Sequence, residues 1–114
     1  MQLLPSSLAF FRLPVRDLEI ARRFYGQLLG LPHLGDDDFD CGGVRLRLTA
    51  DARRAGRPTG LTFHIGDVED AAARMVTFRL GDTRDTPAGR AVTIRDPDGN
   101  TLDLLQEPPP LGRA

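Results

Sequence analysis

The sequence contains no lysine, so all 15 of its basic residues are arginine. We attribute this to a bias toward GC-rich codons, and it removes the lysine that a Walker-type phosphate loop requires. The 16 acidic residues bring the formal net charge to -1, and no basic stretch offers a surface for nucleic acid. We therefore expect neither nucleic acid nor another polyanion as a partner.

Cysteine is nearly absent and long apolar runs are missing. Cys41 is the single cysteine, which excludes an internal disulfide and fits a reducing cytoplasm, and we expect it to be a buried or half-buried small apolar residue. No apolar run approaches the roughly 20 residues that span a membrane. The first residues lack the basic region and long apolar core of a secretion signal. We expect a soluble, cytoplasmic protein with no membrane partner.

The chain consists of two copies of one pattern, in which a strand is followed by a helix and then by short strands. In the first copy, residues 10–15 alternate as a strand does, Asp17 is a good helix N-cap, and residues 18–29 have helical apolar spacing up to Gly30. The second copy begins about 50 residues later, with Asp67 as the corresponding cap. The 114 residues suit one small domain in which the two copies pack together.

The second copy predicts a strand at residues 61–65 and a helix over residues 68–78. Residues 91–95 and 101–105 then read as antiparallel neighbours joined by the turn DPDGN. The segment GDTRDTPAGR reads as a polar, turn-rich loop with strand potential only at its ends, and ADARRAGRPTG reads as an exposed linker between the copies.

Three segments have a distinctive pattern: LPVRDLEIARRFYGQLLGL, FHIGDVEDAAARM and GRAVTIRDPDGNTLDLLQ. Together they resemble the vicinal oxygen chelate superfamily, which includes glyoxalase I, fosfomycin- and bleomycin-resistance proteins and extradiol dioxygenases. The resemblance implies an α+β fold of two paired βαβββ modules, whose curved sheets form a cup with the helices outside. It places one glyoxalase-like domain at residues 1–114, with module one at about 7–50 and module two at about 59–107.

In metal-dependent members of this superfamily, the resemblance implies up to four ligand positions on the first and last strands of the modules. Here these positions hold Phe10, Arg47, Gly60 and Asp103. Only Asp103 can bind a metal, and one carboxylate does not supply the several ligands that transition metals need. The resemblance therefore implies a binding protein of the bleomycin-resistance type, without metal or other cofactor.

Strand alternation then predicts which side chains face the cup. We expect them to form a pocket for a small, partly aromatic ligand with anionic or carbonyl groups, because arginine binds carboxylate and phosphate bidentately. The predicted ligand-binding residues are Phe10, Arg12, Arg45, Arg47, Thr62, His64 and Asp103.

A structural role competes with binding for two of these residues. Asp103 would instead form a salt bridge with Arg47. His64 would instead be a hydrogen-bonded strand residue. The acidic run at residues 36–40 lacks the ligand spacing of an EF-hand and is expected to be a solvated loop.

Three functions remain open. The first is sequestration of a toxic or signalling small molecule, such as an antibiotic, by a metal-independent homodimer. The alternative is a metal-dependent glyoxalase/lyase- or dioxygenase-type enzyme with a nonstandard site, which would use His64 or Asp103 as acid or base, or a metal shared across a dimer interface. The third is a degenerate copy that serves only as an interaction or dimerisation module.

Overall fold

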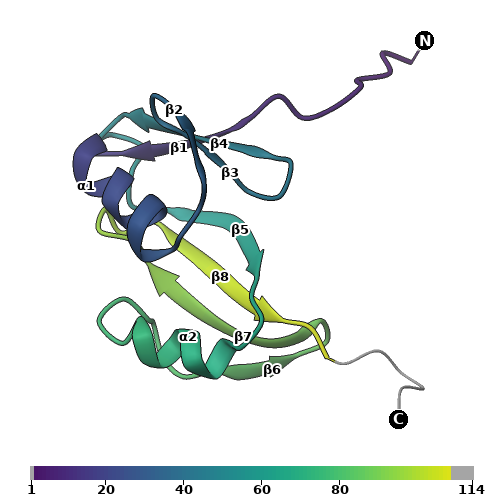
Figure 1. Cartoon of the computed structure of the whole chain (residues 1–114), viewed down its shortest axis with the longest axis vertical. Coiled ribbons are helices and arrows are strands. Elements are labelled where there is room, and N and C mark those ends of the chain that lie inside the picture. Colours follow the sequence, from purple (N-terminus) through teal and green to yellow (C-terminus); the bar gives the residue numbers. More distant parts are fainter. Residues whose placement is uncertain (1, 109–114) are drawn as a thin grey trace. The chain divides into compact units, whose positions relative to one another are not determined.

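The computed structural model describes residues 2–108 and divides the chain into two compact units, one ending at Ala55 and the next beginning at Gly56. Each unit contains one open, mixed four-stranded sheet with a helical segment (Figure 1). The strand orders are β1-β4-β3-β2 and β5-β8-β7-β6. Both units therefore have the same topology, which confirms the predicted α+β fold and its internal repeat.

The elements of the first unit are β1 (Phe11–Val15), α1 (Leu18–Arg22), the π-helix η1 (Arg23–Leu28), β2 (His33–Gly35), β3 (Asp38–Asp40) and β4 (Arg45–Ala50). Those of the second are β5 (Pro58–His64), α2 (Val68–Arg74), β6 (Arg84–Thr86), β7 (Gly89–Arg95) and β8 (Thr101–Gln106). In each unit the first strand pairs in parallel with the last, and the remaining pairs are antiparallel.

Both predicted N-caps are present. The Asp17 carboxylate accepts a hydrogen bond from the Ile20 N–H at 3.1 Å, and Asp67 accepts one from the Asp70 N–H at 3.0 Å. Each bond satisfies a backbone donor that the first helical turn leaves without a partner. Each capping aspartate therefore marks the start of the helix that follows the first strand of its unit.

The first helix differs from the prediction in its second half. A regular helix was expected over residues 18–29, but the chain widens into η1, where the Leu29 N–H donates to the Phe24 carbonyl at 2.8 Å. In this wider turn Gly26 lies against the Phe39 ring, where an added Cβ would be 3.0 Å from the ring edge. Helical periodicity alone cannot reveal such a turn, because the apolar spacing changes by only one residue.

The hydrophobic cores confirm most of the predicted inward-facing residues. Each core lies between the sheet and the helical segment of its own unit, and α2 packs on β7 and β8 (Figure 1). Four residues expected in the core are only half-buried, and all four lie in or next to the edge strands β1 and β5. The confirmed residues are Leu13, Val15, Leu46, Leu48, Leu102 and Leu104, and the half-buried ones are Phe11, Leu61, Phe63 and Ile65.

Two polar segments that were predicted as loops contain strands. Within the acidic run at residues 36–40, β3 pairs with β4 and Asp38 is only 6% exposed. Within GDTRDTPAGR, β6 pairs with β7 in a hairpin. Both strands are three residues long and mostly polar, so each is too short for its side-chain pattern to identify it as a strand.

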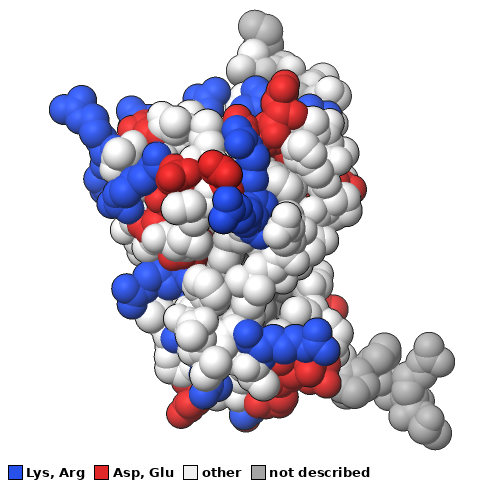
Figure 2. All heavy atoms as spheres, turned by 60° about the vertical axis from the view of Figure 1, so that its left-hand side comes forward, with Lys and Arg blue, Asp and Glu red and all other residues white. Residues whose placement is uncertain are grey.

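In both units, most charged side chains form salt bridges with residues of the same unit. Figure 2 shows basic and acidic side chains next to one another on the face in view, in keeping with the net charge of -1. No helix among residues 2–108 is long and apolar enough to cross a membrane.

Candidate functional site

Four of the predicted ligand-binding residues lie together on one face of the first sheet. Arg12 in β1 is directly opposite Arg47 in β4, and Asp38 in β3 is opposite Arg47 on its other side. Residues that are opposite on paired strands point to the same face of a sheet. We call Phe10, Arg12, Asp38, Arg45 and Arg47 the arginine platform.

The Asp38 carboxylate accepts hydrogen bonds from two of the platform arginines. Arg47 donates from Nε to Oδ1 at 2.9 Å and from Nη2 to Oδ2 at 3.1 Å, and Arg45 donates from Nη1 to Oδ2 at 2.9 Å. The Asp38 side chain is only 8% exposed, while those of Arg45 and Arg47 remain 45% and 39% exposed. The hydrogen bonds from Arg47 hold the pKa of the Asp38 carboxyl below its usual range, so Asp38 is ionised at neutral pH.

Phe10 supplies the aromatic part of the platform. Its ring centre is 4.0 Å from the guanidinium carbon of Arg47 and 5.3 Å from that of Arg12. Both distances lie within the range of cation–π attraction. The ring and the Asp38 carboxylate therefore restrain Arg47 from two directions, while part of its guanidinium stays in solvent.

In the second unit, Asp103 is already engaged by neighbours on its own sheet. Its Oδ1 accepts from the Thr93 hydroxyl at 2.5 Å and lies 3.6 Å from Nη2 of Arg84. Arg84 also donates to the Thr93 hydroxyl at 3.1 Å. A salt bridge between Arg47 and Asp103 was expected as one alternative, and each of the two residues has a salt-bridge partner within its own unit.

Thr62 and His64 are exposed residues of β5, and Thr62 is the register partner of Asp103 in β8. The His64 Nε2 lies 2.9 Å from the Glu107 carboxylate, with both side chains mostly in solvent. This contact agrees with the reading of His64 as a hydrogen-bonded strand residue, and its predicted role in binding stays a prediction.

The four positions that correspond to metal ligands in the superfamily do not fit a metal ion. Phe10 and Gly60 have no donor atom, Arg47 is a cation, and the Asp103 carboxylate is bound to Thr93 and Arg84. Within residues 2–108, no three His, Cys, Asp or Glu side chains come close enough to hold a metal. We therefore assign no chemical role to a metal ion at these four positions.

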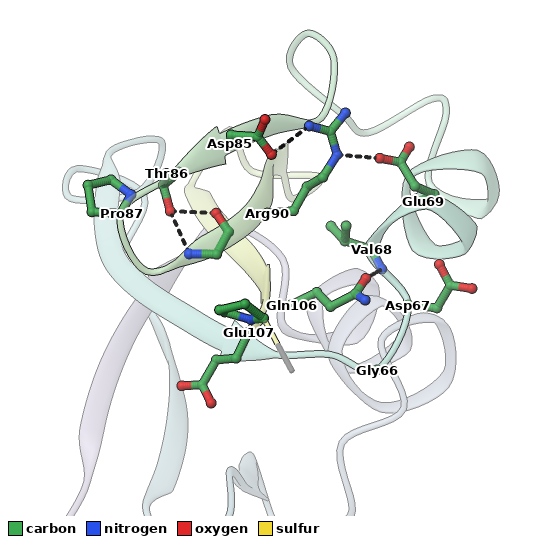
Figure 3. Close-up of a pocket in the computed structure, with 12 residues that line it drawn as sticks. Gly66, Asp67, Val68, Glu69, Asp85, Thr86, Pro87, Arg90, Gln106 and Glu107 are labelled. Carbon is green, nitrogen blue, oxygen red and sulfur yellow. Dashed lines mark hydrogen bonds and ion pairs between the residues drawn. The ribbon is translucent and has the colours of Figure 1, made fainter. Parts of the chain in front are cut away.

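A cavity lies elsewhere on the second unit. It has a volume of about 630 Å³ and lies between the start of α2, the β6–β7 hairpin and the end of β8 (Figure 3). Arg90 spans it, with Nε 2.7 Å from Glu69 and Nη1 2.9 Å from Asp85, while Gln106 accepts from the Val68 N–H at 2.9 Å. Because its one arginine is already bound to two carboxylates, we place the candidate site on the arginine platform instead.

Sequence reasoning missed Asp38, Thr93 and Arg84. Asp38 belongs to the run Asp38-Phe39-Asp40, in which the buried Phe39 alternates with two acids on the other face. That alternation was the available signal, but the polarity of the whole segment concealed it. The platform as a whole offers exposed guanidinium N–H donors beside an aromatic ring, and these can bind an anionic or carbonyl group on a flat ligand.

Comparisons with known proteins agree with this architecture. The sequence model of the Glyoxalase/Bleomycin resistance protein/Dioxygenase superfamily matches residues 7–104. No curated protein matches the chain significantly. Among solved structures, TnmS3, an antibiotic binding protein from Streptomyces sp. CB03234, is 28% identical with a TM-score of 0.78, covering 94% of this chain and 100% of its own.

Two further solved structures show the range of related proteins. A glyoxalase/bleomycin resistance protein from Streptomyces sp. CB03234 is 29% identical, with a TM-score of 0.68 and coverage of 88% of this chain and 100% of its own. A lactoylglutathione lyase from Agrobacterium tumefaciens is 24% identical, with a TM-score of 0.67 and coverage of 90% and 95%. The likeness to the lyase is one of fold.

Proposed function

Because this chain belongs to the Glyoxalase/Bleomycin resistance protein/Dioxygenase superfamily, we propose that it is a metal-independent protein that binds and sequesters a small molecule. The ligand is partly aromatic, carries an anionic or carbonyl group, and binds at the arginine platform. An antibiotic is the kind of molecule that we expect.

The observation that carries this proposal is the platform itself. Arg45 and Arg47 are held by a buried carboxylate, yet more than a third of each side chain is exposed. Holding an arginine in place before the ligand arrives reduces the conformational entropy that binding must cost. The Phe10 ring beside Arg47 adds an apolar surface for the rest of the ligand.

Two further observations support a binder over an enzyme. The positions that hold metal ligands in enzymes of the superfamily are occupied here by Phe10, Arg47 and Gly60 together with one engaged carboxylate. TnmS3, which is 28% identical over nearly the whole chain, is an antibiotic binding protein. Because the scaffold serves several chemistries, the residues of the site are the main support for a binding function, and the similarity to TnmS3 is additional support.

Titration with a panel of antibiotics that includes bleomycin should reveal at least one compound that binds saturably. Replacing Arg47 with alanine should weaken its binding by about tenfold or more, because the ligand loses a charge-assisted hydrogen bond. Isothermal titration calorimetry measures both affinities. Arg74→Ala is the matched control, since Arg74 is an exposed arginine of α2 that pairs with Asp70 and should not affect binding.

Equal affinities of wild-type protein and Arg47→Ala would remove the platform from the site. The enzyme alternative has its own signature. Protein purified without chelator would contain a stoichiometric transition metal, and a chelator would abolish its activity. We expect instead that ligand affinity is the same with and without EDTA.

We further propose that the protein is a cytoplasmic homodimer. The half-buried edge strands β1 and β5 leave Phe11, Leu61 and Phe63 partly exposed, and a second copy of the chain would cover such apolar surface. Static light scattering at micromolar concentration should then give twice the chain mass of 12.5 kDa. A mass of one chain would contradict the dimer and leave the binding site untouched.

A further inference from the structure

The arginine platform combines three arginines with one buried acid on a single sheet face. Arg12 and Arg47 lie opposite each other on paired strands, an arrangement in which like charges repel. Asp38 offsets this repulsion through its contacts with Arg47 and Arg45. Within residues 2–108, Arg12 forms no salt bridge, so the face keeps an excess of positive charge.

The direction of the hydrogen bonds decides which guanidinium atoms stay available. Asp38 occupies the Nε–Nη2 edge of Arg47 and one terminal nitrogen of Arg45. The Nη1 end of Arg47 and the remaining nitrogens of Arg45 make no hydrogen bond with Asp38. These nitrogens are therefore the donors that Asp38 leaves available to an anion.

This placement gives Asp38 two opposing effects on a ligand. It aligns Arg47 beside the Phe10 ring, which favours a flat molecule whose anionic group lies in the plane of its ring. It also repels negative charge, and the repulsion grows with each further charge on the ligand. Two other acids lie nearby: Asp36 raises the pKa of Arg47 through its charge, although less than Asp38 does, and the Asp40 carboxylate accepts from the Gly43 N–H at 2.9 Å.

We propose that Asp38 is a positioning and specificity residue, which weakens the binding of dianions such as aryl phosphates to the arginine platform relative to that of planar aromatic monoanions such as aryl carboxylates. This inference rests on the proposed function, since it names the ligand class of the same site.

The test compares three probes that share one ring system: naphthoate, naphthyl phosphate and the neutral naphthalenemethanol. Isothermal titration calorimetry near pH 8, where the phosphate is a dianion, should show that wild-type protein binds naphthoate at least about tenfold more tightly than naphthalenemethanol. Asp38→Asn should raise the affinity for naphthyl phosphate relative to that for naphthoate by about tenfold, because the repulsive charge is gone. Asp38→Glu, which restores the charge, should recover the wild-type ratio of the two affinities.

Asp40→Asn is the matched control. Asp40 faces the same side of the sheet opposite Arg45, but its carboxylate contacts the Gly43 N–H and not an arginine. The Asp40→Asn substitution removes one negative charge, and it should change the ratio of the affinities for naphthoate and naphthyl phosphate by less than about threefold. A ratio of two affinities does not depend on the fraction of protein that is folded, so a purely structural role of Asp38 would leave it unchanged.

Three results would overturn the inference. They are equal binding of naphthoate and naphthalenemethanol to wild-type protein, an unchanged ratio of the naphthoate and naphthyl phosphate affinities in Asp38→Asn, and failure of naphthoate to bind at all. The first and third need no variant, so the inference remains testable if Asp38→Asn does not fold. None of these results bears on the antibiotic titration with Arg47→Ala, which decides the proposed function separately.

Discussion

Replacing Asn100 with alanine should lower the free energy of unfolding by about 2–4 kcal/mol. Asn100 is 1% exposed, and its Oδ1 accepts from the Gly56 N–H at 2.8 Å and the Arg57 N–H at 3.2 Å. Its Nδ2 also donates to the Asp96 carboxylate at 3.0 Å. Alanine would leave two backbone donors and a buried carboxylate oxygen without these partners, and each such loss costs more than the bond contributed.

Urea denaturation of the wild-type and variant proteins measures this difference. Gln27→Ala is the control, because it removes the same amide group from an exposed position of η1 and should change stability by less than about 0.5 kcal/mol. A loss below about 0.5 kcal/mol in Asn100→Ala as well would show that water replaces the side chain at Gly56 and Arg57.

Replacing Gly89 with alanine should destabilise the protein by at least about 3 kcal/mol. Gly89 begins β7 with a φ of +143°, and an added Cβ would overlap the Gln106 carbonyl oxygen of β8. Because this neighbour is backbone, a rotamer change cannot relieve the clash. The end of β8 would have to move, and with it the Gln106 side chain that accepts from the Val68 N–H at the start of α2.

Gly81→Ala separates this clash from backbone strain. Gly81 has a φ of +83° with no atom within 4 Å of an added Cβ, so alanine there should cost only the roughly 1–2 kcal/mol of a left-handed conformation. Thermal unfolding followed by circular dichroism compares the two variants. Equal losses of stability would mean that β7 and β8 separate locally at little cost and that the close approach at Gly89 is unimportant.

Most of the features that were predicted correctly depend on local sequence. The N-caps Asp17 and Asp67 and the apolar alternation of β1, β4 and β8 each act within a few residues, so the sequence alone indicates them. The internal repeat then made the topology of one unit a guide to the other. Strand alternation also fixes the face of the sheet on which each side chain lies. Four of the seven predicted binding residues therefore lie together on the platform of the first unit.

Features that depend on pairing between strands were missed. Asp38 is buried because Arg47, nine positions along the chain, lies opposite it in an antiparallel pair. Without that register, an aspartate in the run DDDFD is indistinguishable from a solvated one. The same holds for Asp103, whose bond with Thr93 depends on the pairing of β7 with β8. Charge identifies the residues that can form such contacts, and register decides which of them do.

The position of the last strand of each unit has a consequence for synthesis on the ribosome. β4 and β8 are central strands, and each pairs in parallel with a first strand that precedes it by 35 residues (Phe11 with Leu46) or 41 residues (Thr62 with Asp103). The N-terminal unit can complete its sheet while the second unit is still being translated. A nascent chain that stops before Thr101 lacks the strand on which β5 and β7 both depend, so β5 and the β6–β7 hairpin remain separate until β8 has been made.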